Sequence, residues 1–153
     1  MSIAVIVIEN KVDKDIDALC AKFLKRINGY HKIELIKLPA ARLRDPLAQK
    51  AKESETIMAQ FKPTDTVLLC DELGKEYTSV GFATLLEQEF SQLRGRLVFV
   101  IGGAYGFTDE LKKSNTLIRL SKFVFPHHLA RLVLIEQIYR GLCIQRNMPY
   151  HHE

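Results

Sequence analysis

The feature that most constrains the fold is a pair of short, continuously apolar runs, IAVIVI at 3–8 and LVFVI at 97–101. Both runs are rich in β-branched residues, and neither alternates apolar with polar side chains. A strand with one solvated face shows such alternation, whereas a strand covered on both faces is apolar throughout. The two runs therefore predict a parallel sheet enclosed between two layers of helices.

Two further strand-like runs, Ile33–Leu38 and Thr66–Cys70, lie between the first pair in the sequence. The intervening segments 16–24 and 82–93 carry apolar residues every three or four positions, which is typical of helices. A more polar helix is predicted from Pro46 to about Phe61. Its charged residues indicate a solvated surface: Lys50, Lys52, Glu53 and Glu55. The alternation of strands and helices predicts an α/β domain with helices on both faces of the sheet.

The C-terminal third of the sequence holds another apolar run, Leu120–Phe125, followed through Pro126 by a long predicted helix from His127 to about Gln145. The apolar residues of this helix fall on more than one face, which indicates burial on several sides. In so small a domain, contact between two subunits accounts for the extra burial most simply. The candidate contact faces are Leu134/Ile138 and Ile135/Leu142.

Composition and charge limit the class of protein. The chain has 153 residues and a formal net charge of +4, so we expect one domain spanning 1–153, compatible with an RNA partner. Its three cysteines, Cys20, Cys70 and Cys143, lie far apart in apolar segments and indicate reduced core residues. No apolar stretch approaches the roughly 20 residues needed to cross a bilayer, and we expect a cytoplasmic protein without a membrane partner.

A glycine-rich segment, GGAYG at 102–106, directly follows the predicted strand 97–101. Two explanations are open: a tight turn from strand to helix, or a ligand that approaches the main chain more closely than a Cβ would allow. The segment lacks the glycine spacing of dinucleotide-binding loops. Ligands of such sheets bind beyond the carboxyl ends of the strands. This loop, the loop after Cys70 and the approach to Pro126 are therefore candidate binding loops.

Other chemistry is less well supported by the residues. His127–His128 and His151–His152 are adjacent pairs whose side chains diverge, and no acidic partner lies at a ligand spacing, so we expect no metal site. Glu136 and Arg140 have the spacing of an ion pair within a helix. A phosphoacceptor receiver domain is an alternative from another class, because acidic and basic residues loosely match its layout: Glu9, Asp71 and Lys122. A non-catalytic RNA-binding module is a third interpretation.

Four segments resemble the ribosomal large-subunit methyltransferase H family, which are minimal members of the knotted SPOUT class of RNA methyltransferases. They are LCDELGKEYTSVGFA, FVIGGAYGF, LSKFVFPHHLARLVLIEQIYR and PYHH, and the resemblance extends over essentially the whole chain. It implies an S-adenosylmethionine-dependent enzyme that methylates N3 of a pseudouridine in 23S rRNA within the assembled 70S ribosome. It also implies an obligate homodimer and a SPOUT-type domain with a deep C-terminal trefoil knot. The knot follows from the resemblance alone, because unknotted chains are the general expectation.

The resemblance also assigns a cofactor site. The residues that it implies in contact with S-adenosylmethionine are Cys70, Gly102, Gly103, Leu120, Ser121, Lys122, Phe123, Val124 and Phe125. The family commonly has a larger aliphatic residue at position 70, so Cys70 supplies a smaller apolar contact. On this interpretation, the freedom of Gly102 and Gly103 lets the main chain close over the ligand. A valine at position 102 is then expected to block the cofactor and to leave the fold mostly intact.

The residues that we expect to take part in catalysis lie in the last third of the chain. Arg140 is expected to stabilise negative charge on the uracil-like ring, with His127 or His151 as the proton acceptor. The residues expected to hold the substrate are Arg131, Tyr150 and His152. The family usually has a permanently basic residue where His152 stands, so the charge here depends on pH. We expect the tail to reach over the cofactor pocket of the partner subunit.

Overall fold

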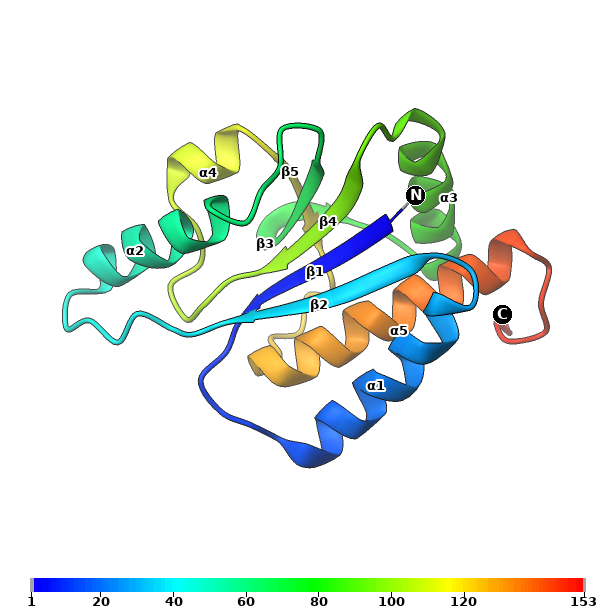
Figure 1. Cartoon of the computed structure of the whole chain (residues 1–153), viewed down its shortest axis with the longest axis horizontal. Coiled ribbons are helices and arrows are strands. Elements are labelled where there is room, and N and C mark those ends of the chain that lie inside the picture. The colour runs from blue at the N-terminus through cyan, green and yellow to red at the C-terminus, as the bar shows by residue number, and fades with distance from the viewer. Residues whose placement is uncertain (1, 153) are drawn as a thin grey trace.

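In the computed structural model, which describes residues 2–152, five parallel strands form one sheet in the order β2-β1-β4-β3-β5 (Figure 1). The strands are β1 (Ser2–Ile8), β2 (Lys32–Leu38), β3 (Thr66–Glu76), β4 (Arg96–Ile101) and β5 (Thr116–Arg119). The helices are α1 (Lys14–Asn28), α2 (Pro46–Met58), α3 (Ser79–Gln92), α4 (Asp109–Lys113) and α5 (His127–Gln145). The predicted α/β class and parallel sheet are confirmed.

The sheet is covered on both faces, as the two continuously apolar runs predict. Alternate residues of β1 separate into two cores, with Ile3, Val5 and Val7 facing one and Ala4 and Ile6 facing the other. Helices α1, α3 and α5 supply the first core, and α2 and α4 supply the second (Figure 1). The register pairs β1 with β4 from Ser2↔Arg96 to Val7↔Ile101, so the two most apolar strands lie side by side at the centre.

Local sequence signals explain where most helices begin. The side chains of Asp13, Asp45, Thr78 and Thr108 accept hydrogen bonds from main-chain N–H groups at the starts of α1, α2, α3 and α4. Such caps satisfy donors that have no partner within the helix. Helix α5 differs, because Pro126 precedes it and no side-chain cap is present. None of the helices within residues 2–152 is long and apolar enough to cross a membrane.

Two predicted segments differ from the structure at the sheet edge. The fifth strand is Thr116–Arg119, whereas the apolar run Leu120–Phe125 forms an irregular loop in which Phe123 and Val124 are 82% and 96% exposed. Strand β3 continues beyond Cys70 to Glu76 with a shift of register against β5. Gly74 permits this path, because a Cβ there would meet the main chain of Ile118.

The predicted contact faces of the last helix are also corrected. Leu134, Ile135, Ile138 and Leu142 are all fully buried within the single chain. Helix α5 lies between α1 and α3 on one face of the sheet, and this position accounts for its burial on several sides (Figure 1). None of these four residues is available for contact between subunits.

Candidate functional site

The register shift of β3 after Cys70 and the loops after β4 and β5 line the largest cavity described, with a volume of about 380 Å³. It lies beyond the carboxyl ends of β4 and β5 and beside the point where the pairing of β3 with β4 ends, at the edge of the sheet where ligands of parallel sheets bind. The predicted cofactor residues all line it: Cys70, Gly102, Gly103, Leu120, Ser121, Lys122, Phe123, Val124 and Phe125. Its remaining walls include Asp71, Lys112, Arg119 and His127. Of these, His127 is an expected catalytic residue, and Asp71 is named only in the receiver-domain alternative. The structure therefore brings the three candidate loops together.

The glycines of the 102–106 loop are required by the protein's own packing. A Cβ on Gly102 would meet the ring of the buried Phe107, and a Cβ on Gly103 would collide with the carboxylate of Glu53. Gly106 has a φ of +73°, which favours glycine. Packing against Phe107 is thus a reason for glycine at position 102 within the protein itself, and the expected close approach of a ligand there stays a prediction. A valine there would damage the fold as well as the cavity.

Helix α2 holds this glycine loop at both ends. Glu53 packs against Gly103, and the Ser54 hydroxyl accepts a hydrogen bond of 3.1 Å from the N–H of Thr108. Glu53 also accepts a hydrogen bond of 3.1 Å from the N–H of Ala41. Both side chains are 1% exposed, so the prediction that Glu53 lies on a solvated surface is wrong. No sequence signal identifies it, since its charged neighbours Lys52 and Glu55 are exposed.

At the register shift of β3, the strand supplies a thiol and a carboxylate to the cavity wall. Burial raises the pKa of the Cys70 thiol to about 12, so it is a neutral, weakly polar contact. The neighbouring Asp71 forms an ion pair of 3.4 Å with Lys112 of α4. Its side chain is mostly buried, and its other oxygen accepts from the N–H of Leu73 at 2.9 Å. Cys20 and Cys143 are buried and all three cysteines are free, as predicted.

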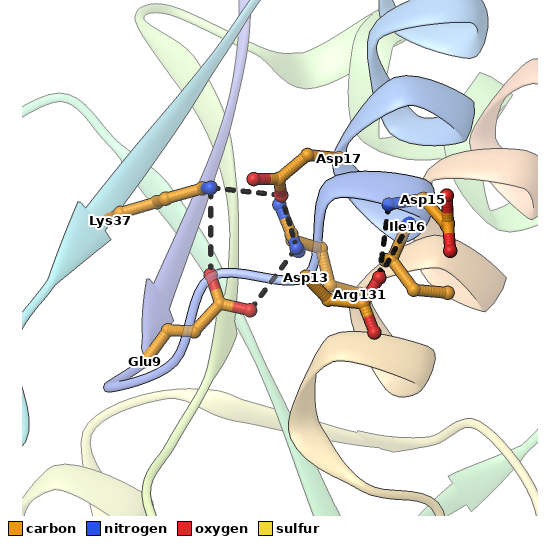
Figure 2. A network of polar contacts seen from close by, with 7 residues as sticks. All are labelled: Glu9, Asp13, Asp15, Ile16, Asp17, Lys37 and Arg131. Atoms are coloured by element: carbon orange, nitrogen blue, oxygen red, sulfur yellow. Dashed lines mark hydrogen bonds and ion pairs between the residues drawn. The ribbon is translucent and has the colours of Figure 1, made fainter.

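Arg131 lies outside this cavity, in a buried ion-pair network at the end of β1 (Figure 2). Its Nη2 contacts Glu9 at 3.1 Å and Asp17 at 2.7 Å, and Lys37 contacts Asp17 at 3.0 Å. The Arg131 side chain is 1% exposed. Because this guanidinium is buried, RNA cannot reach it within the single chain. Its ion pairs instead have a structural role, in which they fix α5 against β1 and α1.

The C-terminal tail folds back onto the end of α5. Arg140 donates to Glu136 Oε1 from Nε and Nη2 at 3.1 and 2.7 Å, which confirms the predicted ion pair. Its Nη1 contacts Nδ1 of His151 at 3.1 Å, and its guanidinium lies over the Tyr150 ring. The Tyr150 hydroxyl donates to Glu136 at 3.0 Å. Three predicted site residues thus form one cluster, the tail cluster: Arg140, Tyr150 and His151, joined by Glu136.

Within one chain, the tail cluster and the cavity are separated. His127 lines the cavity at the start of α5, and Arg140 lies near the end of the same helix. At a rise of about 1.5 Å per residue, they are roughly 20 Å apart along the helix. The predicted catalytic residues His127, His151 and Arg140 are therefore not all brought together in a single subunit, and His152 is exposed beyond the tail cluster.

Strand order argues against the receiver-domain alternative. Receiver domains have the order 2-1-3-4-5, which sets the third strand beside the first. Here β4 lies between β1 and β3, so Glu9 and Asp71 are separated by a strand. Both carboxylates are also occupied by ion pairs, and Lys122 lies in a loop instead of a strand. Within residues 2–152, no three metal-ligating side chains converge.

Comparisons with known proteins find similarity over the whole chain. Residues 1–151 match a family model described as "Predicted SPOUT methyltransferase". The chain is 40% identical to the ribosomal RNA large subunit methyltransferase H of Flavobacterium johnsoniae, over 100% of both chains. It is 49% identical to the protein of the same name from Parabacteroides distasonis, over 69% of this chain and 68% of that one. It is 36% identical to that of Christiangramia forsetii, over 99% of each.

Proposed function

The chain belongs to the SPOUT methyltransferase family, and from this premise we propose that it methylates N3 of a pseudouridine in the 23S rRNA of the assembled 70S ribosome. The methyl donor is S-adenosylmethionine, and the compartment is the cytoplasm. The observation that carries the proposal is the convergence of three predicted binding segments on one cavity: residues 70–72 at the register shift of β3, and the loops after β4 and β5. No feature of the structure favours a receiver domain.

The lining of the cavity fits the proposed cofactor. Its volume of about 380 Å³ lies in the range of small-molecule sites, which are mostly apolar with a few polar groups. Apolar contacts come from Cys70, Ile101, Leu120 and Phe125, and Asp71 offers a nearby negative charge. When bound, S-adenosylmethionine supplies an activated methyl group. The chain's own task is to hold the acceptor nitrogen aligned with it, which lowers the barrier by up to roughly 7–11 kcal/mol.

The separation of the cavity from the tail cluster supports a homodimer with a shared site. A second subunit could carry its Arg140, Tyr150 and His151 to the mouth of the first subunit's cavity, whereas the first subunit's own cluster lies at the far end of α5. We include the deep C-terminal trefoil knot in this proposal on the strength of the family. The dimer contact must use surfaces other than the buried faces of α5.

In the proposed reaction, Arg140 stabilises the negative charge that develops on the base as N3 loses its proton. Its hydrogen bonds to Glu136 raise the pKa of the guanidinium, which keeps it charged and fixes its direction. Arginine only donates, so Nδ1 of His151 is the acceptor of the contact with Arg140. His151 must therefore release Arg140 before Nδ1 can take a proton. His127, at the cavity wall, is the second proton acceptor that we propose.

Isothermal calorimetry tests the cofactor first. S-adenosylhomocysteine should bind the wild-type protein, whereas Mg²⁺ with acetyl phosphate should give no heat. Ala104 lies at the exposed mouth of the cavity, and we expect Ala104→Trp to abolish binding and Ala104→Ser to retain it. A wild-type protein that binds ribosomes and no S-adenosylhomocysteine would instead be the non-catalytic RNA-binding module.

Mixed dimers test the shared site. Ala104→Trp should inactivate the cavity, and Arg140→Ala should inactivate the tail cluster, so each homodimer should be inactive on ribosomes. A mixed dimer retains one intact cavity facing one intact tail cluster, and co-expression should restore methylation to a substantial fraction of the wild-type rate. If mixed dimers form and stay inactive, both halves of the site belong to one subunit.

The nucleotide and the proton acceptor need separate measurements. Mass spectrometry of 23S rRNA from a strain that lacks the protein should show loss of one methyl group from one pseudouridine, regained on complementation. Single-turnover methylation by His127→Ala and by His151→Ala identifies the proton acceptor. If both variants react at the wild-type rate, neither imidazole takes the proton.

A further inference from the structure

The end of the molecule that carries the C-terminal tail has a group of arginine and tyrosine side chains that the proposed reaction does not use. The guanidinium of Arg146 lies 4.5 Å from the centre of the Tyr30 ring. The Tyr30 hydroxyl contacts the sulfur of Met148 at 3.1 Å, which joins the end of α1 to the tail. Arg26, on the last turn of α1, lies over the rings of Phe23 and Tyr139 at 5.4 and 5.5 Å.

These stacks continue into the tail cluster. The Tyr139 and Tyr150 rings meet edge to face at 4.8 Å between centres, and Tyr150 in turn lies under the Arg140 guanidinium. We define the arginine–aromatic patch as Arg26, Tyr30, Arg146 and Tyr150. Both arginines are exposed, and the two tyrosines are partly exposed. The patch is therefore an open surface beside the residues that we propose to hold the target base.

The two arginines of the patch lie over aromatic rings. Within residues 2–152, they are not paired with carboxylates, like Arg42, Arg44 and Arg94, whereas four other arginines are: Arg96, Arg119, Arg131 and Arg140. Arg146 donates to the Leu142 carbonyl at 3.2 Å and contacts His31 at 3.4 Å, and these contacts fix its position without neutralising it. A guanidinium stacked on a ring keeps N–H edges suited to a phosphate.

The surroundings of the patch strengthen its positive charge. Lys22 and Lys25 are exposed on α1. Lys22 lies four residues before Arg26 and shares its helix face, and Lys25 is the adjacent residue in the sequence. Charged donors next to partly exposed aromatic rings are the combination by which proteins bind single-stranded or looped RNA, in which phosphates meet the charges and unstacked bases meet the rings.

We propose that the arginine–aromatic patch binds the sugar–phosphate backbone of single-stranded rRNA next to the target nucleotide, through Arg26 and Arg146. This rests on the proposed rRNA methylation and names the surface along which the substrate approaches. The tail cluster and the patch share Tyr150, so RNA held at Arg26 and Arg146 leads directly to Arg140 and His151. The patch lies far from the cofactor cavity of its own subunit, and its variants should leave cofactor affinity unchanged.

The chain provides a matched control. Arg42 and Arg44 are also exposed, and they lie in the segment between β2 and α2 at the opposite end of the molecule from the C-terminus (Figure 1). A double replacement at either pair removes the same charge. If ribosome binding depends on net charge alone, the two double variants should bind equally weakly. If the patch is specific, only the replacement of Arg26 and Arg146 should weaken binding.

The experiment measures binding to purified 70S ribosomes from a strain that lacks the protein, by co-sedimentation with S-adenosylhomocysteine at several KCl concentrations. The double variant Arg26→Gln/Arg146→Gln should bind several-fold more weakly. Its plot of log affinity against log salt should be less steep by about 1.4, since each charge removed from a single-strand contact lowers the slope by about 0.7. Arg26→Lys/Arg146→Lys should keep the wild-type slope. Arg42→Gln/Arg44→Gln should match the wild type.

Two further measurements separate this inference from the proposed function. Calorimetry with S-adenosylhomocysteine and thermal melting verify that each variant is folded with an intact cavity, and the single variants replace the double one if it melts early. The proposed role of the patch is wrong if Arg26→Gln/Arg146→Gln binds ribosomes with wild-type affinity and salt dependence. It is also wrong if the Arg42→Gln/Arg44→Gln control loses as much affinity. Ribosomes that are bound by the wild type but never methylated would overturn the proposed function and leave the patch standing. Failure of the wild type to bind ribosomes would overturn both.

Discussion

The carboxylate of Glu53 fills the space that a side chain on Gly103 would occupy. Glu53 comes from the buried side of α2, and Gly103 belongs to the loop that walls the candidate cofactor cavity. The next residue, Ser54, binds the far end of the same loop at Thr108. Glu53 and Ser54 of α2 do not line the cavity. They nevertheless set the path of the loop that forms one wall of the cavity.

This relationship predicts a coupling between positions 53 and 103. Gly103→Ala should lower the free energy of unfolding by about 1–3 kcal/mol, because the new methyl group overpacks a filled space. In a Glu53→Ala background the same change should cost less than half as much, since the obstructing carboxylate is gone. Urea unfolding of the four proteins measures the coupling. Equal costs in the two backgrounds would mean that the loop moves away from α2 instead of colliding with it.

Arg131 is predicted to stabilise the fold through its buried ion pairs. Arg131→Met should lower the free energy of unfolding by about 3 kcal/mol, because it leaves the mostly buried Glu9 and the partly buried Asp17 with only Lys37 for a partner. Lys37→Met, at a side chain that is 40% exposed, should cost about 1 kcal/mol or less. Chemical denaturation checks both values. A stable Arg131→Met protein with impaired ribosome binding would restore the contact with RNA that the resemblance implied.

The same ion-pair network predicts how the free energy of unfolding decreases at acidic pH. Hydrogen bonds from Lys37, and next from Arg131, hold the pKa of Asp17 below its ordinary value of 3.8. A carboxyl group with a lowered folded-state pKa stabilises the fold above the unfolded pKa, and this contribution is lost as the pH falls through the folded pKa. Wild-type stability should therefore fall below about pH 4, and Asp17→Asn should be less stable at neutral pH with a flatter acid limb. Urea unfolding of both proteins at several pH values across this range measures the effect. If the stabilities of the wild type and Asp17→Asn fall in parallel with pH, Asp17 does not cause the loss of stability in acid.

The sequence predicts the fold class and the position of the cavity because both depend on local patterns. Continuous apolar runs at 3–8 and 97–101 indicate strands covered on two faces, and the glycine loop follows the second of them. The run Leu120–Phe125 misleads, since apolar residues that line a cavity mouth cannot be told from a strand by pattern alone. Phe123 and Val124 are exposed within the single chain, which no periodicity can reveal.

The remaining errors concern contacts between distant segments. Glu53 is surrounded in sequence by exposed charges, and only its tertiary position beside Gly103 and Ala41 makes it buried. Similarly, α5 carries apolar residues on several faces because α1, α3 and the sheet surround it within one chain. Arg131 resembles a substrate residue until Glu9 and Asp17, more than one hundred positions away, are found beside it.

The Cys70 thiol is predicted to be unreactive despite its place in the cavity. With a pKa of about 12, roughly one thiol in 10⁴ is ionised near pH 8, and the thiolate is the reactive species. Iodoacetamide should label Cys70 far more slowly than a free cysteine in the native protein, and all three cysteines should be labelled quickly in urea. Peptide mapping by mass spectrometry follows each site. Rapid native labelling of Cys70 would show that the cavity opens to water and ionises the thiol.

Tyr150 is predicted to hold the tail cluster together, and two substitutions separate its ring from its hydroxyl. Tyr150→Phe loses the hydrogen bond of 3.0 Å to Glu136 and keeps the contacts with Tyr139 and Arg140, so it should cost about 1 kcal/mol of stability and slow methylation only slightly. Tyr150→Ala also loses both ring contacts, and Arg140 then loses the surface that orients it. We expect single-turnover methylation of ribosomes to fall at least tenfold in Tyr150→Ala, since misplacement of a group by about 1 Å can cost a hundredfold.

Chain ends are commonly frayed, and a frayed tail would make both substitutions silent. The half-buried Tyr150 and its three partners argue against fraying in residues up to 152, and Glu153 lies outside the described residues. Removing only position 153 is the matched control, because it spares Tyr150, His151 and His152, and it should retain most of the methylation rate. If Tyr150→Ala methylates as fast as the wild type, Arg140 is positioned by Glu136 alone, and the aromatic ring contributes to stability without contributing to catalysis.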